Sequence, residues 1–374
     1  MESILDEFRA AIRAANETRM PLRLRGGGSK DFYGQALTGN VLDTTAYRGI
    51  VDYDPAELVI TARCGTPLTE IEAALADCRQ MLAFEPPHFC APGLATLGGA
   101  VAAGLSGPRR QSAGALRDFV LGAQLMDGHG EVMSFGGQVM KNVAGYDVSR
   151  LLAGSLGTLG IVLEVSLKVM PVPFGDATLR FEVSQEEALD RLNTWGGQPL
   201  PLAASAWHDG VLHVRLSGAT AAIRSACEKL GGERVHEAEA VALWHSLREQ
   251  SHDFFAPAFP PQSATPSGPM GAALWRIATP TTAPVLPLPG AQLVEWGGGQ
   301  RWWLAPAEAD DSAAEAVRAA ARAVGGHATL FRNGDKDVGV FTPLASPLMA
   351  IHQRLKATFD PAGIFNPQRM YPGL

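Results

Sequence analysis

The 374-residue sequence predicts an α+β protein of two domains. A chain of this length with 46% hydrophobic residues is too long for one ordinary compact core, and its apolar fraction is normal for a folded protein. Beyond residue 174 the expected elements follow the order strand, helix, strand, strand, helix, which is typical of a ferredoxin-like half. Pro171 and Pro173 interrupt the chain after a long alternating strand. We therefore place the first domain boundary at residue 173.

Hydrophobic periodicity predicts the elements of the first domain, residues 1–173. One helix should follow a strand directly, with Thr66 as its N-cap, Pro67 at its first position, and Ile71 and Leu75 on its apolar face. The turn Gly128–Gly130 should join two strands as a hairpin. The remaining expected elements are helices over 4–15 and 147–154 and strands over 20–25, 59–63, 119–127, 131–135 and 160–170.

The second domain, residues 174–345, should contain one continuous α+β sheet. Ser184 and Glu187 fit a capping box that opens a helix ending near Trp195, and Asp209-Gly210 is a hairpin signal. Residues 256–290 are rich in Pro, Ser and Thr and read as a long loop with one short strand. The other expected elements are strands over 177–183, 202–208, 211–217, 273–278, 292–304 and 327–332 and helices over 219–230 and 310–324. The last segment, 346–374, should hold a helix over 346–359 and a turn-rich tail.

Bulk composition excludes several classes of function. A net charge of −7 argues against a nucleic-acid partner, because phosphate binding favours a basic surface. Four cysteines occur without a Cys-x-x-Cys pair, so an iron–sulfur cluster is not expected. The longest uncharged stretch, 89–107, contains Pro92 and five glycines and would make a poor membrane span. We expect a reduced cytoplasmic protein.

The first segment that carries chemistry is Arg25-Gly26-Gly27-Gly28-Ser29-Lys30, with Gly34 beyond it. Three glycines after a strand let backbone N–H groups turn inward as a nest for phosphate, and Ser29 and Lys30 add a hydroxyl and a charge. The pattern matches neither the P-loop nor the Rossmann fingerprint. An ordinary glycine-rich turn is the alternative.

Two further glycine-rich segments favour close approach of a flat ligand. The second runs from Pro92 to Ala102 and contains Gly93, Thr96, Leu97, Gly98 and Gly99. A tightly packed helix of small residues is the alternative for this segment. The third comprises Lys141–Asp147 and then Gly154-Ser155-Leu156-Gly157-Thr158-Leu159-Gly160-Ile161-Val162, which leads into a strand.

In order and separation, these segments resemble the FAD-binding domain shared by vanillyl-alcohol oxidase, p-cresol methylhydroxylase, D-lactate dehydrogenase and glycolate oxidase. The tail is similar too, with Asp360-Pro361 and Asn366-Pro367. The resemblance covers roughly 20–172 and 350–374 and implies that segment 346–374 packs on a FAD-binding domain of the p-cresol methylhydroxylase type. The run KNVAGYDVSRLLAGSLGTLG looks like the FAD-binding subunits of glycolate oxidase, whereas the larger catalytic paralogue usually has Glu at Leu156.

The resemblance implies a set of FAD-binding residues. The first loop and the Pro-Gly segment would hold the pyrophosphate, the third segment would line the adenine and flavin side, and Asn366 would lie near the isoalloxazine ring. Several relatives attach flavin through a His where this chain has Gly28, so we expect non-covalent FAD. The implied residues are Gly26, Gly27, Gly28, Ser29, Lys30, Gly34, Pro92, Gly93, Thr96, Leu97, Gly98, Gly99, Gly154, Ser155, Gly157, Gly160, Ile161, Val162 and Asn366.

No metal site is expected. The His-x-x-Gly-Asp-Gly-Asn-x-His segment of the related hydroxy-acid dehydrogenases is absent. His245, Glu249 and His252 have the spacing of one helix face and could bind Zn²⁺, but a solvated helix face is the simpler interpretation. His208 and His213 flank a hairpin and are expected at the surface.

A substrate carboxylate would favour an arginine as its ligand. The two candidates for this catalytic role are Arg301 and Arg332, which both lie in expected strands of the second domain. Beside Arg301, Trp302 and Trp303 are expected to pack in the sheet.

The resemblance implies a subunit of a glycolate oxidase complex that oxidises glycolate to glyoxylate. Its partners would be a larger FAD-containing subunit and an iron–sulfur subunit that passes electrons to a quinone-type acceptor, and the chain would be cytoplasmic or peripheral at the inner membrane through the complex. A self-sufficient 2-hydroxy-acid dehydrogenase and an assembly subunit with structural FAD are the rivals. The Pro-rich stretch Phe254–Pro289 is suggested as a partner surface, and a loop packed on its own domain is the alternative.

Overall fold

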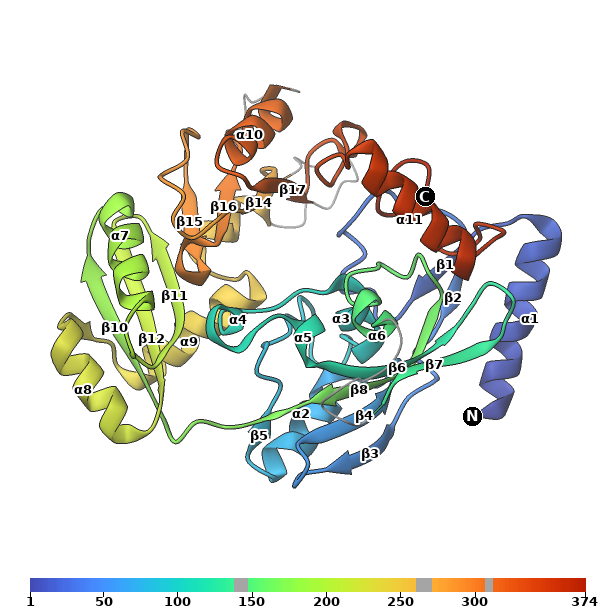
Figure 1. The fold of residues 1–374 in the computed structure, drawn as a ribbon, viewed down its shortest axis with the longest axis horizontal. Coiled ribbons are helices and arrows are strands. Elements are labelled where there is room, and N and C mark those ends of the chain that lie inside the picture. Colours follow the sequence, from blue (N-terminus) through green and yellow to red (C-terminus); the bar gives the residue numbers. More distant parts are fainter. Residues whose placement is uncertain (138–146, 260–270, 307–311) are drawn as a thin grey trace. The chain divides into compact units, whose positions relative to one another are not determined.

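The computed structural model describes residues 1–137, 147–259, 271–306 and 312–374, so the expected KNVAGY segment lies outside it. The chain forms two compact units (Figure 1). The first comprises Met1–Ser106, Ala115–Val172 and Pro343–Leu374, and the second comprises Gly107–Gly114 and Pro173–Thr342. The chain passes from the first unit to the second between Val172 and Pro173, within one residue of the boundary that the sequence suggested. The short excursion at Gly107–Gly114 was not expected.

The first unit is built around a five-stranded antiparallel sheet with the order β3-β4-β8-β6-β7. A parallel pair, β1 and β2, and a small pair, β5 and β9, lie outside this sheet. The strands are β1 (Leu22–Arg25), β2 (Asn40–Asp43), β3 (Ile50–Asp54), β4 (Val59–Arg63), β5 (Gln80–Met81), β6 (Val120–Met126), β7 (Val132–Gly136), β8 (Ile161–Lys168) and β9 (Met170–Pro171). The helices are α1 (Glu2–Thr18), α2 (Leu68–Asp77), α3 (Leu97–Ala103), α5 (Leu116–Phe119), α6 (Val148–Leu151) and α11 (Ser346–Phe359).

The core of the first unit joins segments that are far apart in the sequence. Phe8 and Ile12 of α1 pack in one buried cluster with Leu163 of β8 and with Ile364 and Phe365 of the tail. The tail also enters the backbone network, because Leu22 forms a parallel bridge with Phe365. Burial of side chains of this size contributes roughly 1.5–3 kcal/mol each. The C-terminal segment is therefore part of the first unit's core.

A buried ion pair fixes the tail to this core. The Lys356 ammonium lies 2.6 Å from the Asp360 carboxylate and donates to the carbonyls of Thr158 and Phe365 at 2.7 and 2.6 Å. The Asp360 carboxylate also accepts from the backbone N–H groups of Ile364 and Phe365. Burial lowers the pKa of Lys356, and the neighbouring Asp360 opposes that shift. Because these charged groups are compensated by several hydrogen bonds, the pair can persist away from water.

The second unit contains one antiparallel sheet of eight strands in the order β13-β10-β12-β11-β15-β16-β14-β17, which confirms the single continuous sheet expected from the sequence. Its strands are β10 (Gly175–Glu182), β11 (Leu202–His208), β12 (Val211–Gly218), β13 (Glu233–Arg234), β14 (Leu274–Ala278), β15 (Gln292–Glu295), β16 (Gln300–Leu304) and β17 (His327–Arg332). Its α-helices are α4 (Arg110–Ala113), α7 (Gln185–Gly196), α8 (Thr220–Leu230), α9 (Glu237–Glu249) and α10 (Ser312–Ala323), and its 3₁₀ turns are η1 (Asp253–Ala258), η2 (Trp296–Gly298) and η3 (Lys336–Val338).

Two buried clusters hold helices on this sheet. Leu192 of α7 and Ile223 of α8 pack with β10 and β12, and Val317 of α10 packs with Trp275 and Trp303. Of the expected capping box at α7, the Ser184 half is confirmed, since the Ser184 side chain accepts from the Glu187 N–H at 3.2 Å, whereas the Glu187 carboxylate pairs with Arg191. The expected packing of Trp302 and Trp303 in the sheet is also confirmed, because both are buried.

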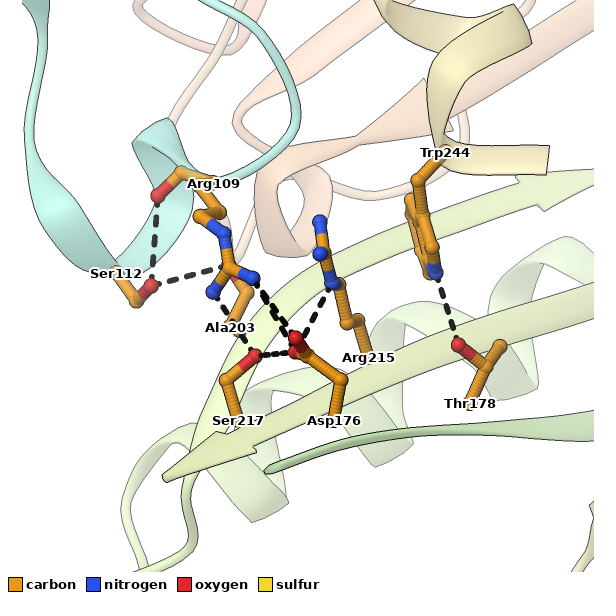
Figure 2. Close-up of polar contacts among 8 residues, drawn as sticks. All are labelled: Arg109, Ser112, Asp176, Thr178, Ala203, Arg215, Ser217 and Trp244. Carbon is orange, nitrogen blue, oxygen red and sulfur yellow. Dashed lines mark hydrogen bonds and ion pairs between the residues drawn. The ribbon is translucent and has the colours of Figure 1, made fainter. Parts of the chain in front are cut away.

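The excursion Gly107–Gly114 folds with the second unit through polar contacts (Figure 2). The Arg109 guanidinium donates to Ser217 Oγ at 2.9 Å and pairs with the Asp176 carboxylate at 3.2 Å. Arg215 contacts the same carboxylate at 3.2 Å, and Ser112 Oγ donates to the Ala203 carbonyl at 3.0 Å. These contacts attach the α4 segment to the sheet through side chains of β10 and β12 and a backbone carbonyl of β11.

Two expectations about the secondary structure were wrong. Thr66 does not cap α2, whose N-cap is Pro67, because Thr66 Oγ1 bonds instead with the backbone of Gly49. Residues 292–304 form two strands rather than one, since Trp296, Gly297 and Gly298 all have positive φ and reverse the chain at η2. The consecutive glycines there permit this turn at little steric cost.

No helix in the described ranges has the length and the apolar character needed to cross a bilayer.

Removing one member of the Lys356–Asp360 pair should destabilise the first unit. Asp360→Ala leaves a buried ammonium without its carboxylate and two backbone donors without an acceptor, so we expect a loss of about 3–5 kcal/mol in the free energy of unfolding. Urea denaturation monitors this loss. Asp6→Ala, which removes an exposed partner of Arg9, is the control and should cost at most about 1 kcal/mol. Equal stability of the two variants would contradict a structural role for the buried pair.

Candidate cofactor site

A pocket in the first unit brings together several of the glycine-rich segments. Its volume is about 550 Å³, including the space at its open mouth. It collects Gly26, Gly27, Gly28, Ser29, Lys30, Thr96, Gly99 and Asn366 from the residues that the sequence suggested. The residues that the sequence did not suggest are Leu24, Arg25, Asp31, Tyr33, Leu37, Ala102, Ala103, Leu156 and Arg369.

The first loop offers unused backbone donors. Gly28 has φ +73°, in the left-handed region that glycine adopts without strain. Within the described residues, the N–H groups of Gly27 and Gly28 donate to no other protein group. Successive free N–H groups in such a loop form a concave site for an anion. The geometry suits a phosphate oxygen.

Glycine is required at positions 26 and 27 for a different reason. A Cβ on Gly26 would lie 2.3 Å from Thr96 Oγ1, and a Cβ on Gly27 would lie 1.5 Å from the Leu94 carbonyl oxygen. Real Cβ atoms do not approach other atoms this closely. These two glycines therefore allow the first loop to pack directly on the second glycine-rich segment.

The second segment forms a turn and the start of α3. Thr96 is the N-cap of α3, and its side chain accepts from the Gly99 N–H at 3.3 Å. Gly98 lies against Cys64, the residue after β4, because a Cβ there would lie 2.7 Å from Cys64 Cβ. Leu97 is buried, and Gly93 has φ +87° with open space around it. Only Thr96 and Gly99 of the suggested residues here line the pocket.

Most of the third segment does not line the pocket but packs in the protein next to it. Gly154, Gly157 and Gly160 all have positive φ, and a Cβ on Gly160 would lie 2.6 Å from the Met126 carbonyl oxygen. Ser155 is buried and its carbonyl accepts from Thr158 Oγ1 at 2.8 Å. Ile161 and Val162 are buried in β8. From this segment Leu156 lines the pocket, with φ +51°.

Asn366 joins three parts of the pocket wall. Its Oδ1 accepts from the Leu24 N–H at 2.9 Å, and its Nδ2 donates to the Leu156 carbonyl at 2.7 Å. Its backbone N–H also donates to the Leu22 carbonyl. The side-chain amide thereby positions the end of β1, which leads into Gly26–Gly28, against the third segment.

Arg369 is a site residue that sequence reasoning missed. Its guanidinium donates to the carbonyls of Asp31, at 2.8 Å, and of Gln35 and Tyr33. Burial lowers the pKa of Arg369 to about 10. The only available signal was its position three residues after Asn366, and nothing in the sequence shows that it would fold back on residues 31–35.

The charges that line the pocket favour an anion. Arg25, Lys30 and Arg369 contribute three cations against the one carboxylate of Asp31, which also pairs with Arg23. Lys30 Nζ lies 3.2 Å from Ser29 Oγ. Among charged residues lining the pocket the balance is therefore positive, although the whole chain has a net charge of −7.

The two arginines suggested as ligands of a substrate carboxylate both lie in the second unit, but their surroundings differ. Arg301 is fully buried in β16 and donates to the carbonyls of Gly298, Ala283 and Pro284, so its guanidinium is occupied by its own domain. Arg332, at the end of β17, is half-buried and lies over the ring of Phe259 at 4.2 Å. Burial lowers the pKa of each to about 10. This geometry argues against Arg301 as a substrate ligand.

The histidines do not form the arrangement considered for a metal. His245 is exposed on α9, whereas His252 lies beyond the end of that helix, and no group of three metal-ligating side chains occurs among the described residues. His208 and His213 are half-buried and line a separate open pocket with His252, so each is partly exposed at the surface. Burial, reinforced by nearby Arg180 and His252, lowers the pKa of His213 to about 4.

The Pro-rich stretch is only partly described, because 260–270 lie outside the structure. Phe254 and Phe255 are buried and pack edge to face, and Phe255 also contacts Trp302. The idea that these two rings form a partner surface was therefore wrong. They contribute to the core of their own domain, and only Phe259 of the three is exposed.

Comparison with known proteins assigns the cofactor. Residues 4–136 match the family model described as FAD binding domain. The chain is similar to the glycolate oxidase subunit GlcE of Escherichia coli, with 46% identity across 100% of this chain and 98% of that protein. It is also similar to the glycolate oxidase subunit GlcD of Bacillus subtilis, with 32% identity across 46% of this chain and 37% of that protein.

The fold is similar to that of solved alkyldihydroxyacetonephosphate synthase, with a TM-score of 0.66 and 14% identity over 98% of this chain and 76% of that one. At this identity the likeness concerns the fold alone. The full-length similarity, together with the FAD-binding domain, decides the family: the chain belongs to the glycolate oxidase GlcE subunits, which are FAD-binding oxidoreductase subunits.

Proposed function

We propose that this chain holds a second, electron-relaying FAD in a glycolate oxidase complex. In this proposal the larger flavoprotein subunit oxidises glycolate to glyoxylate, an iron–sulfur subunit takes the electrons, and a quinone-type acceptor receives them. The single observation that carries the proposal is the cationic pocket of the first unit, where the N–H groups of Gly27 and Gly28 donate to no other group among the described residues. This unit holds most of residues 4–136, which match the FAD binding domain model.

The residues present fit FAD. Gly27, Gly28, Ser29 and Lys30 would hold the pyrophosphate, since they supply backbone donors, a hydroxyl and a cation on one side of the pocket. Thr96 and Gly99 would contribute the part of the wall that lies directly beside the first loop, and Asn366 would fix its shape. When bound, FAD supplies a carrier that accepts two electrons and can release them singly. The protein's part is to bind, orient and shield this group.

The role of electron relay is preferred to independent substrate oxidation on two grounds. The hydroxy-acid dehydrogenase metal segment is absent from the sequence. The guanidinium of Arg301 is also occupied by backbone carbonyls, which leaves Arg332 as the remaining suggested carboxylate ligand. Turnover by the isolated chain would favour the self-sufficient dehydrogenase, and Arg332 would then be the residue to test.

Purified chain and reconstituted complex should behave differently. The isolated flavoprotein should keep its yellow absorbance when mixed with glycolate or D-lactate, because the proposed substrate site lies in another subunit. The absorbance should bleach when glycolate is added with the larger flavoprotein subunit and the iron–sulfur subunit. Anaerobic spectra near 450 nm measure both results. Bleaching by glycolate without partners would reject the relay role, and flavin that never reduces in the complex would indicate a structural cofactor.

The flavin should be released by acid. Gly28 offers no side chain for a covalent link at the position where several relatives have a His. Precipitation with trichloroacetic acid should therefore leave all flavin absorbance in the supernatant. Flavin fluorescence that stays with the denatured chain on a gel would show that the attachment is covalent.

Gly28→Val should remove most FAD binding from a folded chain. A β-branched residue at φ +73° is strained by roughly 1–3 kcal/mol, and its side chain would displace the Arg25 guanidinium at the pocket. We expect affinity for FAD to fall at least tenfold, measured by fluorescence titration of the apoprotein.

The matched control is Gly325→Val. Gly325 has φ +78°, has no neighbour within 4 Å of its Cβ position, and lies after α10 in the second unit. It carries similar backbone strain away from the pocket, so its FAD affinity should remain at the wild-type value. Full flavin stoichiometry in Gly28→Val, or equal loss in both variants, would refute the pyrophosphate assignment.

A further inference from the structure

A second pocket lies within the second unit, and the proposed function makes no use of it. Its volume is about 630 Å³, including the space at its open mouth. Strands β10, β11, β12 and β15 and helix α9 contribute to its lining. We call it the histidine pocket, because His208, His213 and His252 line it. Every residue known to line it belongs to the second unit, so the pocket does not depend on where the first unit lies.

Strand register brings two of the histidines and an arginine to one face of the sheet. Arg180 of β10 pairs with His213 of β12, which pairs in turn with Ala206 of β11, so the three side chains point to the same side. His208 lies two residues after Ala206 and therefore on the same face. The ring of His208 contacts the ring of His252 edge to face, with centroids 5.6 Å apart. The fold thus gathers three imidazoles and one guanidinium from separate segments around one cavity.

These imidazoles carry hydrogen-bonding groups that the protein does not use. His252 Nδ1 accepts from the Phe254 N–H at 3.2 Å, so the neutral ring carries its proton on Nε2. Within the described ranges, the rings of His208 and His213 form no hydrogen bond. Each neutral ring therefore offers one donor and one acceptor to a molecule in the pocket.

The protonation state of the histidines depends on their burial. Burial lowers the pKa of all three rings, and that of His213 falls to about 4. The nearby Arg180 and His252 add to the shift at His213. Carboxylates of Asp209 or Asp253 oppose the shift in the other two rings. At neutral pH the His213 ring is therefore uncharged, and an anion beside it would favour its protonated form.

The charged groups on this face provide little compensation inside the pocket. Among the described residues that line it, Asp209 is the only acid, and it is exposed. Arg180 pairs with Glu182 at 3.0 Å and with Glu233 at 3.4 Å, and both of these carboxylates are exposed to solvent. Arg215, on the same face of β12, pairs with a carboxylate of β10 (Figure 2). The pocket can therefore accommodate one more negative charge.

We propose that the histidine pocket binds a small organic carboxylate. His213 and Arg180, which are neighbours across β12 and β10, would face its oxygens. Its hydrocarbon part would lie against Leu243, Leu247 and Leu293. These apolar side chains favour a carboxylate with a short carbon chain over inorganic phosphate, whose oxygens all need polar partners. The inference goes beyond the proposed function and is independent of it, because the FAD pocket belongs to the first unit.

Isothermal titration calorimetry of the full-length chain with butyrate tests the site. Butyrate should bind saturably, whereas inorganic phosphate and butyramide, which has the same shape without the charge, should not. His213→Gln should weaken butyrate binding at least tenfold, because it removes the group that becomes charged on binding. His245→Gln is the matched control, since His245 is exposed on α9 and outside the pocket, and it should bind butyrate like the wild type. An unchanged melting temperature and flavin content establish that each variant is folded.

The dependence on pH provides a second measurement. A bound carboxylate raises the lowered pKa of His213, so binding takes up a proton. Affinity for butyrate should rise as the pH falls from about 7.5 to about 5.5, by at most about tenfold per pH unit for one proton. The rise should be smaller in His213→Gln. Arg180→Gln keeps every imidazole and should weaken binding severalfold.

Several results would overturn the site. Wild-type butyrate affinity in both His213→Gln and Arg180→Gln would show that butyrate binds elsewhere on the chain. Equal binding of butyramide, or an affinity that does not change with pH, would show that the pocket does not recognise the charge of the ligand. Saturable binding of phosphate without binding of butyrate would exclude the proposed class of ligand. None of these results bears on flavin reduction in the complex, so failure here is distinguishable from failure of the proposed function.

Discussion

The side-chain amide of Asn366 is the constraint on which the first unit's pocket depends. It accepts from the Leu24 N–H and donates to the Leu156 carbonyl, so residues separated by more than a hundred positions meet at one planar group. An amide is suited to this task because it offers a donor and an acceptor a fixed distance apart. Neither Asp nor Leu could satisfy both backbone groups. The tail therefore completes the pocket, and the Lys356–Asp360 pair keeps the tail in place.

The glycines of the pocket act by two different physical effects. Gly28 supplies a positive φ that, in the proposed site, would turn N–H groups toward an anion, whereas Gly26 and Gly27 remove side chains so that two loops can touch. The first effect concerns the ligand directly, and the second concerns the protein's own packing. Both effects produce the same consecutive glycines in the sequence. A glycine run alone therefore cannot show which of its members would contact a cofactor.

Much of the fold could be predicted from the sequence because its signals are local. Alternating strands, the Ser184 cap and the Asp209-Gly210 hairpin each depend on residues a few positions apart. The failures involve partners distant in sequence. Thr66 bonds with Gly49 instead of capping α2, and Arg369 folds back on the carbonyls of residues 31–35. The cofactor segments were found through their resemblance to a family, while the residues that brace them carry no local pattern.

Arginine shows most clearly why residue type alone does not identify a site. Arg301 and Arg369 are both deeply buried, and each donates hydrogen bonds to three backbone carbonyls. A guanidinium offers five N–H donors in a plane, which suits a loop of carbonyls as well as a substrate carboxylate. Because burying a charge is costly, a buried guanidinium must be compensated by hydrogen bonds. When backbone carbonyls accept those bonds, the arginine has a structural role unless a donor remains for a ligand. Among the described residues that line the pocket, the N–H groups of Gly27 and Gly28 donate to no protein group, so the proposed function rests on main-chain geometry.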